Sequence, residues 1–448
     1  RQPLVMPDGD LWLVGNGEIY NHDEVASRIG GAEYSSRSDN EVALHLLANR
    51  GPEALGELEG MFALLTAGPD GSFMAARDPV GIKPLYWARA DGRVQFASEM
   101  AAFDAELQAL VEVFPPGHYW MPEAGLERFA EAVPQRREEP AAEATVERER
   151  EQTRQVLIAS VKRQMMGDVP VGVFLSGGLD STLVAAIAAR RLAEREERLQ
   201  TFAVGTEGSP DLLAARVAAE HLGTEHHERI YTAQEALDAV PAVVRAIEHF
   251  DPSLVRSAVP NFFLAEMTAR HVKVVLTGEG ADELFAGYEY LRDFSDPERL
   301  HAEITRTVEG LHNLNLQRCD RVTMAHGLEA RVPFLDRQVI EFALSLPAKS
   351  KLAGPDQPEK RLLREAFSGW LPDELLWRKK SEFGDGSGAA SVLTAAMEDM
   401  VGEVELERER DTLDPPLRTR EELAYFRIFK DHLPGVRPEH TVGRFATA

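Results

Sequence analysis

The clearest chemical signal in the sequence is a short loop from Ser176 to Ser181, in which two adjacent glycines stand among two serines and an aspartate. Gly177 and Gly178 allow the backbone to approach a ligand and to turn several N–H groups toward it. An alanine-rich helical segment follows, and a helix N-terminus attracts anions through its dipole and its unpaired amides. The loop therefore predicts a phosphate site.

The side chains of this loop sharpen that prediction. The hydroxyls of Ser176 and Ser181 can donate hydrogen bonds to phosphate oxygens. Asp180 would repel a bare phosphate, so we expect it to bind a Mg²⁺ ion that bridges to the phosphate. A simple helix cap would explain Asp180 but not two adjacent glycines, and the Walker pattern is absent. The string resembles the pyrophosphatase loop of the N-type ATP pyrophosphatases, which implies ATP as the ligand.

A second loop of similar design runs over residues 277–283, where another apolar strand ends in glycines and acids. Ligands of open parallel sheets bind at the carboxyl ends of the strands, so we expect both loops at one site. Asp180 and Asp282 could then hold Mg²⁺ together, and Glu279 could contact an amine or orient a nucleophile. Acids on a solvated loop are the alternative interpretation. The predicted ATP contacts are Phe174, Leu175, Ser176, Gly177, Gly178, Asp180, Ser181, Val204, Thr277, Gly278 and Asp282, with Val204 at the adenine.

The elements that must position these loops alternate between strand and helix. Near-continuous apolar strands in such alternation predict an α/β parallel sheet covered on both faces, followed by a mostly helical C-terminal part. The predicted strands lie at 169–175, 199–204, 228–231 and 272–276, and the predicted helices at 182–192, 212–222 and 233–250.

The chain up to about Phe129 is β-rich instead, and its strand clusters with few helices predict an α+β sandwich. Arg, Glu, Pro and Ala then dominate, which indicates a linker. The predicted elements are hairpins at 61–65 with 73–76 and at 85–88 with 94–97, a strand at 11–14 ending in a turn at 15–17, and a helix at 39–49. We therefore divide the chain into a first domain (1–133), a linker (134–151) and a second domain (152–448).

The composition excludes several classes of protein. A formal net charge of −25 argues against nucleic acid or an anionic membrane as a partner. No apolar run approaches the ~20 residues that a membrane span requires. The single cysteine, Cys319, excludes an internal disulfide and fits a reducing cytoplasm, and we expect it to be a buried structural thiol.

Further motifs and their order resemble the glutamine-hydrolysing asparagine synthetases over nearly the whole chain. Asn-Gly-Glu-Ile-Tyr-Asn at 16–21, Ser-Asp at 38–39 and the segments 77–79 and 81–86 are similar to class II glutamine amidotransferase domains, which implies an Ntn-type sandwich. In the second domain the segments 277–288, 327–336, 360–364, 377–380 and 419–425 match the family's synthetase domain.

This resemblance implies a reaction and a set of roles. The β-carboxylate of aspartate attacks the α-phosphate of ATP to give β-aspartyl-AMP and pyrophosphate, and ammonia, normally from glutamine, then displaces AMP to form asparagine. A cytoplasmic enzyme and a homodimer are compatible with it. The implied catalytic residues are Glu279, Lys380 and Asp180; the aspartate contacts are Arg256, Glu283 and Asp336; the glutamine contacts are Asn16, Gly17, Glu18 and Asp39.

Two features depart from the family pattern. Where the family has Asp-Val-Thr-Thr before an arginine, this chain keeps a hydroxyl at Ser253 and loses one at Leu254. A class II amidotransferase also needs an N-terminal cysteine as its nucleophile. Arg1 instead matches a point inside the family's first domain, so the segment with the nucleophile is missing from this sequence. We therefore expect a longer natural chain. The open alternatives are a synthetase that amidates or cyclises another carboxylate, and a non-catalytic nucleotide-binding homologue.

Overall fold

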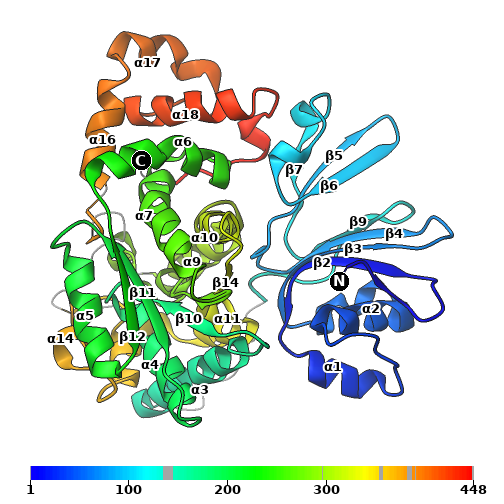
Figure 1. Cartoon of the computed structure of the whole chain (residues 1–448), viewed down its shortest axis with the longest axis horizontal. Helices are drawn as coiled ribbons and strands as arrows, with labels where there is room; N and C mark the ends of the chain where they lie inside the picture. The colour runs from blue at the N-terminus through cyan, green and yellow to red at the C-terminus, as the bar shows by residue number, and fades with distance from the viewer. Residues whose placement is uncertain are drawn as a thin grey trace. The chain divides into compact units, whose positions relative to one another are not determined.

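The computed structural model describes residues 2–134, 145–294, 296–352, 357–380, 386–388 and 390–445. The chain divides into two compact units, which are built on different kinds of sheet (Figure 1). The first unit contains Arg1–Pro134, Leu311–Gln317 and Gly435–Thr441, and the second contains Gln135–Gly310, Arg318–Pro434 and Val442–Ala448.

The first unit is built on a six-stranded antiparallel sheet in the order β1-β2-β3-β4-β8-β9, with a three-stranded antiparallel sheet in the order β6-β5-β7. The strands are β1 (Leu4–Val5), β2 (Trp12–Ile19), β3 (Gly60–Ala67), β4 (Phe73–Arg77), β5 (Tyr86–Ala90), β6 (Arg93–Ala97), β7 (Glu112–Val113), β8 (His118–Met121) and β9 (Gly125–Arg128). The helices are α1 (His22–Ile29) and α2 (Asp39–Arg50).

Alternating side chains give the larger sheet two apolar faces, as expected for strands packed on both sides. One face packs against the helices, with Leu13 of β2 and Leu44 of α2 in the same core. The other face packs against the smaller sheet, where Ala75 of β4 meets Trp87 and Phe114. The predicted α+β sandwich, both hairpins and the helix at 39–49 are confirmed.

The predicted turn at residues 15–17 is wrong, because β2 continues through it to Ile19. Its two glycines serve close packing instead. A Cβ on Gly17 would lie 1.9 Å from the carbonyl oxygen of Met61, and one on Gly15 would lie 2.3 Å from Oδ1 of Asn40. Gly17 also has a φ of 133°, which side-chain-bearing residues rarely adopt.

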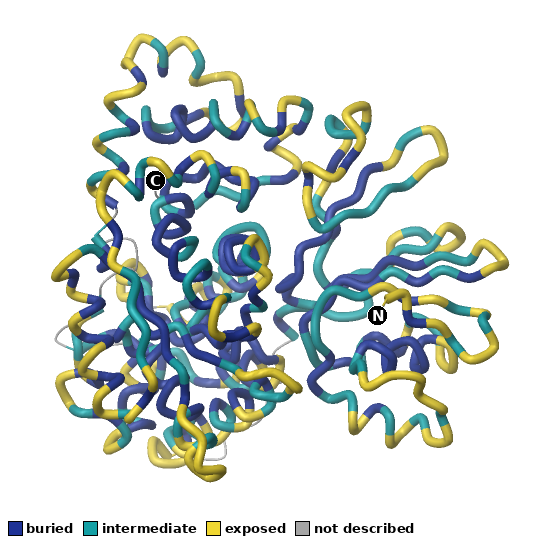
Figure 2. Tube along the Cα trace, viewed as in Figure 1, coloured by how far each residue is buried: buried dark blue, intermediate teal, exposed yellow. Residues whose placement is uncertain are grey.

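The second unit contains a five-stranded parallel sheet in the order β12-β11-β10-β13-β14. Its inner strands β10, β11 and β13 are largely buried (Figure 2). The strands are β10 (Val171–Phe174), β11 (Gln200–Gly205), β12 (Glu225–Ile230), β13 (Val274–Leu276) and β14 (Glu329–Arg331). The predicted parallel sheet and its four strands are confirmed, and β14 is an addition that the sequence did not indicate.

Helices pack on this sheet and form most of the remaining chain, as predicted. Several begin at clear sequence signals: α5 and α7 start with Pro210 and Pro252, whose fixed φ suits a first helical position, and α6 starts at a capping box of Thr232 and Glu235. The helices are α3 (Val146–Gln164), α4 (Leu179–Ala193), α5 (Pro210–Leu222), α6 (Ala233–Ile247), α7 (Pro252–Thr268), α8 (Ala281–Leu284), α9 (Pro297–Gly310), α10 (Asn315–Met324), α11 (Arg337–Ser345), α12 (Ala348–Lys351), α13 (Arg361–Ala366), α14 (Asp373–Leu376), α16 (Ala390–Asp399), α17 (Glu403–Glu409) and α18 (Arg420–His432).

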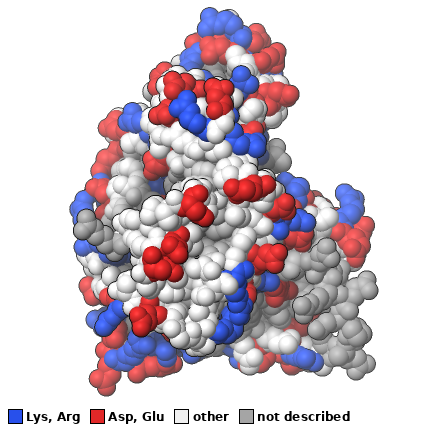
Figure 3. All heavy atoms as spheres, turned by 90° about the vertical axis from the view of Figure 1, so that its right-hand side faces the viewer, with Lys and Arg blue, Asp and Glu red and all other residues white. Residues whose placement is uncertain are grey.

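The predicted domain limits stay predictions. Most of the linker expected at 134–151 lies outside the described residues, and its last part forms the start of α3. Among the residues that the structure describes, no helix combines the length and the apolar character of a membrane crossing. On the face drawn in Figure 3, described acidic and basic side chains are interspersed over uncharged surface. Cys319 is buried, as expected, and burial raises the pKa of its thiol to about 12.

Candidate active site

The first predicted loop lies between β10 and α4, and its own hydroxyls organise it. Ser176 Oγ and Ser181 Oγ are 3.0 Å apart, and the backbone N–H of Ser176 donates to Ser181 Oγ at 3.2 Å. Gly177 has a φ of 71°, and a Cβ there would lie 2.5 Å from Cβ of Ala214 on α5. Gly178 is the N-cap of α4, and it has no side chain that could accept a hydrogen bond from the first amides of the helix. The loop is therefore a tight turn whose amides precede a fifteen-residue helix.

The second predicted loop follows β13 and contacts the first. A Cβ on Gly278 would lie 2.9 Å from Cβ of Asp180 and 3.0 Å from the backbone nitrogen of Ser181. Gly280 adopts a φ of 93° next to Leu335. Because Gly278 has no side chain, the second loop can lie directly against the first. The two loops therefore meet at the carboxyl ends of adjacent parallel strands, as predicted. Val204 is buried near the end of β11, at the same edge of the sheet.

Two lysines join the acids of the two loops. Lys360 Nζ lies 2.5 Å from Asp180 Oδ2 and 2.8 Å from Asp282 Oδ1. Lys380 Nζ lies 2.6 Å from Asp282 Oδ1 and 3.2 Å from the carbonyl oxygen of Gly287. The side chain of Lys360 is only 3% exposed. We call these four residues, Asp180, Asp282, Lys360 and Lys380, the lysine–aspartate cluster.

The electrostatics of the cluster follow from burial and from these contacts. Burial acts to raise the pKa of Asp282, but Lys360 and Lys380 outweigh it and hold that pKa at about 2. Burial raises the pKa of Asp180 despite Lys360. The two carboxylates outweigh burial at Lys360 and raise its pKa, so the lysine stays charged.

The cluster has the donors that a magnesium ion needs. Oδ1 of Asp180 is buried and has no hydrogen-bond partner among the described residues. Within that part of the chain no group of three or more His, Cys, Asp or Glu side chains could hold a metal. One or two carboxylates completed by phosphate oxygens is the usual protein site for Mg²⁺, so Asp180 and Asp282 fit an ion that arrives with a nucleotide.

The two glutamates of the second loop have different partners. The carboxylate of Glu279 accepts a hydrogen bond from Arg318 of α10. Glu283 is buried and accepts a hydrogen bond from the hydroxyl of Tyr288 at 2.6 Å. Burial, with the charge of Asp282, raises the pKa of Glu283 to about 7.

The predicted aspartate contact Arg256 lies in the first turns of α7. Its guanidinium reaches Ser253 Oγ and Thr394 Oγ1, both at 3.4 Å, and Glu421 at 3.8 Å. Leu254 is fully buried in the core. The position that loses a hydroxyl relative to the family therefore faces the core and not these polar partners of Arg256.

Asp336 lies at the start of α11. Its carboxylate accepts a hydrogen bond from the backbone of Gln338 at 3.0 Å and lies 3.4 Å from Arg163 of α3. These contacts alone explain its burial, so its predicted contact with aspartate stays a prediction.

The predicted glutamine contacts of the first unit gather where β2 meets the start of α2. Asn16, Gly17 and Glu18 are consecutive residues of β2. Asp39 is the first residue of α2, and its carboxylate accepts a hydrogen bond from the backbone of Ile19. The side chain of the next residue, Asn40, donates to the carbonyl oxygen of Gly17 at 3.0 Å. The structure therefore brings all four predicted residues into one neighbourhood.

Sequence reasoning missed three residues that organise these sites. Lys360 lies in a motif that carried the family resemblance, but nothing in the sequence linked it to Asp180, 180 positions away. Arg318 gave no signal. Glu41 accepts four hydrogen bonds of 2.5–2.7 Å from Ser35 and Ser36, which fixes the loop before Asp39; its position two residues after that aspartate was the available clue.

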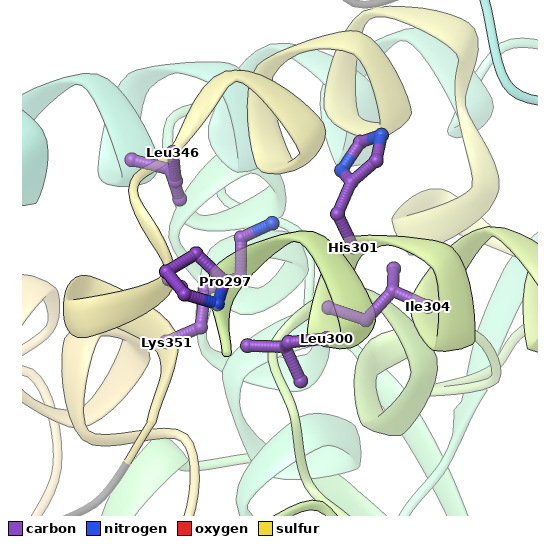
Figure 4. A pocket seen from close by; sticks show the side chains of 7 residues that line it. Pro297, Leu300, His301, Ile304, Leu346 and Lys351 are labelled. Atoms are coloured by element: carbon purple, nitrogen blue, oxygen red, sulfur yellow. The ribbon is translucent and has the colours of Figure 1, made fainter. Parts of the chain in front are cut away.

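A small cavity elsewhere in the second unit is not a rival site. Pro297, Leu300 and Ile304 of α9 line it together with Leu346 and Lys351 (Figure 4). Its volume is about 20 Å³, which suits about one water molecule and no substrate.

Comparison with known proteins gives matches over both units. The family model described as asparagine synthase matches residues 152–296 and 292–433, and the glutamine amidotransferase domain model matches residues 1–105. Asparagine synthetase [glutamine-hydrolyzing] 3 of Arabidopsis thaliana is 40% identical over 410 residues, covering 86% of this chain and 69% of the relative. A probable asparagine synthetase [glutamine-hydrolyzing] of Dictyostelium discoideum is 36% identical over 478 residues, covering 99% and 85%.

Proposed function

Because the chain belongs to the asparagine synthase family, we propose that it uses ATP to amidate L-aspartate to L-asparagine, releasing AMP and pyrophosphate. The observation that carries the proposal is the contact of two strand-end loops through the lysine–aspartate cluster. One loop offers backbone amides and hydroxyls to an anion, and the other offers carboxylates. The cluster adds two lysines.

In this proposal the first loop binds the phosphates of ATP. Its amides at the start of α4 and the hydroxyls of Ser176 and Ser181 face the anion. Asp180 and Asp282 would hold Mg²⁺, which when bound would neutralise phosphate charge. Lys380 contacts the α-phosphate and Lys360 the neighbouring phosphates, since both ammonium groups already lie at the acids that would hold the ion.

The second loop and α7 hold the acceptor. Arg256 pairs with the α-carboxylate of aspartate. Glu283 and Asp336 are the proposed acids on the side of its ammonium group. The β-carboxylate forms a bond to the α-phosphorus as pyrophosphate leaves, giving β-aspartyl-AMP. Glu279 then orients ammonia for the second step.

The first unit supplies the nitrogen in the proposed reaction. Its match to a glutamine amidotransferase domain supports glutamine as the source. We propose that Asn16 and Gly17 stabilise an oxyanion and that Glu18 and Asp39 bind the α-ammonium group of glutamine. A homodimer and a cytoplasmic location are further proposals, and light scattering of the purified protein tests the first.

The test is release of pyrophosphate in the presence of ATP, Mg²⁺ and an ammonium salt, across a panel of amino acids. We expect aspartate alone to stimulate release and asparagine to accumulate. Stimulation by another carboxylate would favour the synthetase with a different acceptor. Nucleotide binding with no release for any amino acid would favour the non-catalytic homologue.

A further inference from the structure

A single buried arginine connects the second loop to the helix that carries the proposed aspartate contact. Arg318 of α10 donates from Nη2 to the carboxylate of Glu279 and from Nη1 to Ser257 Oγ of α7 at 2.9 Å. Its side chain is 9% exposed, and its Nε is buried with no hydrogen-bond partner among the described residues. The guanidinium thus fixes a loop and a helix that are distant in sequence.

The connection extends into the first turns of α7. Ser257 Oγ lies 3.0 Å from the carbonyl oxygens of Ser253 and Leu254, the residues that precede Arg256. A guanidinium is planar, permanently charged and presents donors in a fixed fork, so it sets the orientation of both partners at once. These two partners of Arg318 lie outside the lysine–aspartate cluster, so its influence falls on the amine and acceptor side of the site.

We propose that Arg318 is a positioning residue for amide formation: it holds Glu279 where ammonia must approach the activated aspartate, and it has little part in forming the adenylate. This inference rests on the proposed function. In the step concerned, the lone pair of ammonia forms a C–N bond to the β-carbonyl carbon. The bond from that carbon to the phosphate oxygen breaks, AMP leaves with its electron pair, and the nitrogen loses one proton to solvent.

Without a fixed Glu279, ammonia competes less well with water for the same adenylate. Water attack returns aspartate and AMP, so ATP is consumed without amide formation. Loss of Arg318 therefore has a signature that general damage to the fold does not have, namely a fall in asparagine formed for each pyrophosphate released.

The experiment compares R318M with R321M in the whole chain, with an ammonium salt as nitrogen source. Arg321 is a matched control, because it lies three residues further along α10, is also buried, and pairs with Glu248 and the backbone of Ala246 instead. For R318M we expect asparagine per pyrophosphate to fall about 10- to 100-fold, the effect of misplacing a reacting group by about 1 Å. The KM for ammonium should rise, while the KM for ATP should stay within about twofold.

The control and a conservative variant decide the interpretation. R321M should keep the wild-type ratio, and R318K, which retains the charge but not the fork, should recover part of it. A wild-type ratio in folded R318M, or an equal fall in R321M, would overturn the inference. Absence of aspartate-dependent pyrophosphate release in the wild-type protein would instead overturn the proposed function. If R318M does not fold, R318K becomes the test variant. An unchanged ratio of asparagine to pyrophosphate in R318K, together with an unchanged KM for ammonium, would count against the inference.

Discussion

The two loops of the candidate active site begin alike and end differently. Each follows a buried parallel strand and contains a glycine position with no room for a side chain, Gly177 in the first loop and Gly278 in the second. The first leads into α4, a helix of fifteen residues, whereas the second leads into α8, which has only four. The hydroxyls of the first loop bond within the loop. Its one acid, Asp180, and the acids Glu279 and Asp282 of the second loop instead pair with residues from distant parts of the chain.

This difference separates two ways to bind a charged substrate. A long helix behind a glycine turn attracts an anion with its backbone amides, so no charged side chain is needed for the attraction. A short turn has little dipole of its own, so the second loop depends on side-chain charges, and those charges must be balanced by lysines and an arginine. We therefore expect substitutions in the first loop to affect nucleotide binding, and substitutions among the charges to affect catalysis and stability.

The largest expected effect is on Asp180, the one acid of the first loop. D180N keeps the shape but removes the charge that would hold Mg²⁺, so pyrophosphate release should fall by about 10²–10³-fold or more, as when a single transition-state contact is lost. Aspartate-dependent pyrophosphate release measures it. D168N, at an exposed position just before β10, is the control and should behave as wild type. Persistent turnover in D180N would refute the metal role.

The next effect concerns the balance of charge between the loops. K360M leaves Asp180 and Asp282 facing each other without their shared lysine, and breaking a buried ion pair on one side costs about 3 kcal/mol. Denaturant unfolding measures the change. Because unpaired neighbouring carboxylates have raised pKa values, the variant should lose stability as pH rises above the ordinary aspartate range and approach wild type at low pH.

The matched control for this variant is K379M, which removes an exposed lysine from the same basic segment as Lys380. It should change stability by less than about 0.5 kcal/mol. An equal loss in both variants, or a K360M deficit that grows at low pH, would contradict the proposed balance of charge.

A smaller effect is expected at Glu283, whose folded pKa of about 7 lies above its ordinary value of 4.5. The folded state binds more protons than the unfolded state between these values, so Glu283 lowers stability as pH rises through that window. E283Q abolishes this slope and should stabilise the protein at pH 8 by about 3 kcal/mol relative to its effect at pH 4. Thermal unfolding across pH measures it, with the exposed E289Q as control. Parallel pH profiles for wild type and E283Q would show that the carboxyl is not held neutral.

The fold was predictable where a strand is long enough to show its pattern. The apolar runs of β10, β11 and β13 are unambiguous, but β14 has only three residues and two of them are charged. Arg331 is buried there because it pairs with Glu329 and with the carbonyl oxygens of Gln164 and Met166, a tertiary arrangement that no local pattern reveals. The misassigned turn at residues 15–17 has the same origin, since the need for Gly17 comes from Met61 on the next strand.

The site was predictable to the extent that topology determines it. Residues at the ends of neighbouring parallel strands must meet, and this rule alone places Asp180 beside Asp282. The lysines follow no such rule. In the sequence, a lysine in a loop or at a helix end that faces solvent cannot be distinguished from one that faces a carboxylate. Lys380 came only from a family resemblance, and the roles of Lys360 and Arg318 emerge only from their contacts in three dimensions.

The smallest expected effect tests the first loop's own hydroxyls. S181A removes the oxygen that accepts from the backbone of Ser176 and contacts the Ser176 hydroxyl. Loss of such a neutral hydrogen bond costs about 1 kcal/mol, so the KM for ATP should rise about fivefold with little change in kcat. The comparison variant is T277V in the second loop, where the backbone N–H of Glu279 donates a long 3.4 Å bond to the hydroxyl. Thr277 is itself a predicted ATP contact, so T277V should also raise this KM, but by less than S181A. A KM for ATP that rises as much in T277V as in S181A would show that nucleotide binding is shared equally, and that the two loops do not divide their work as proposed.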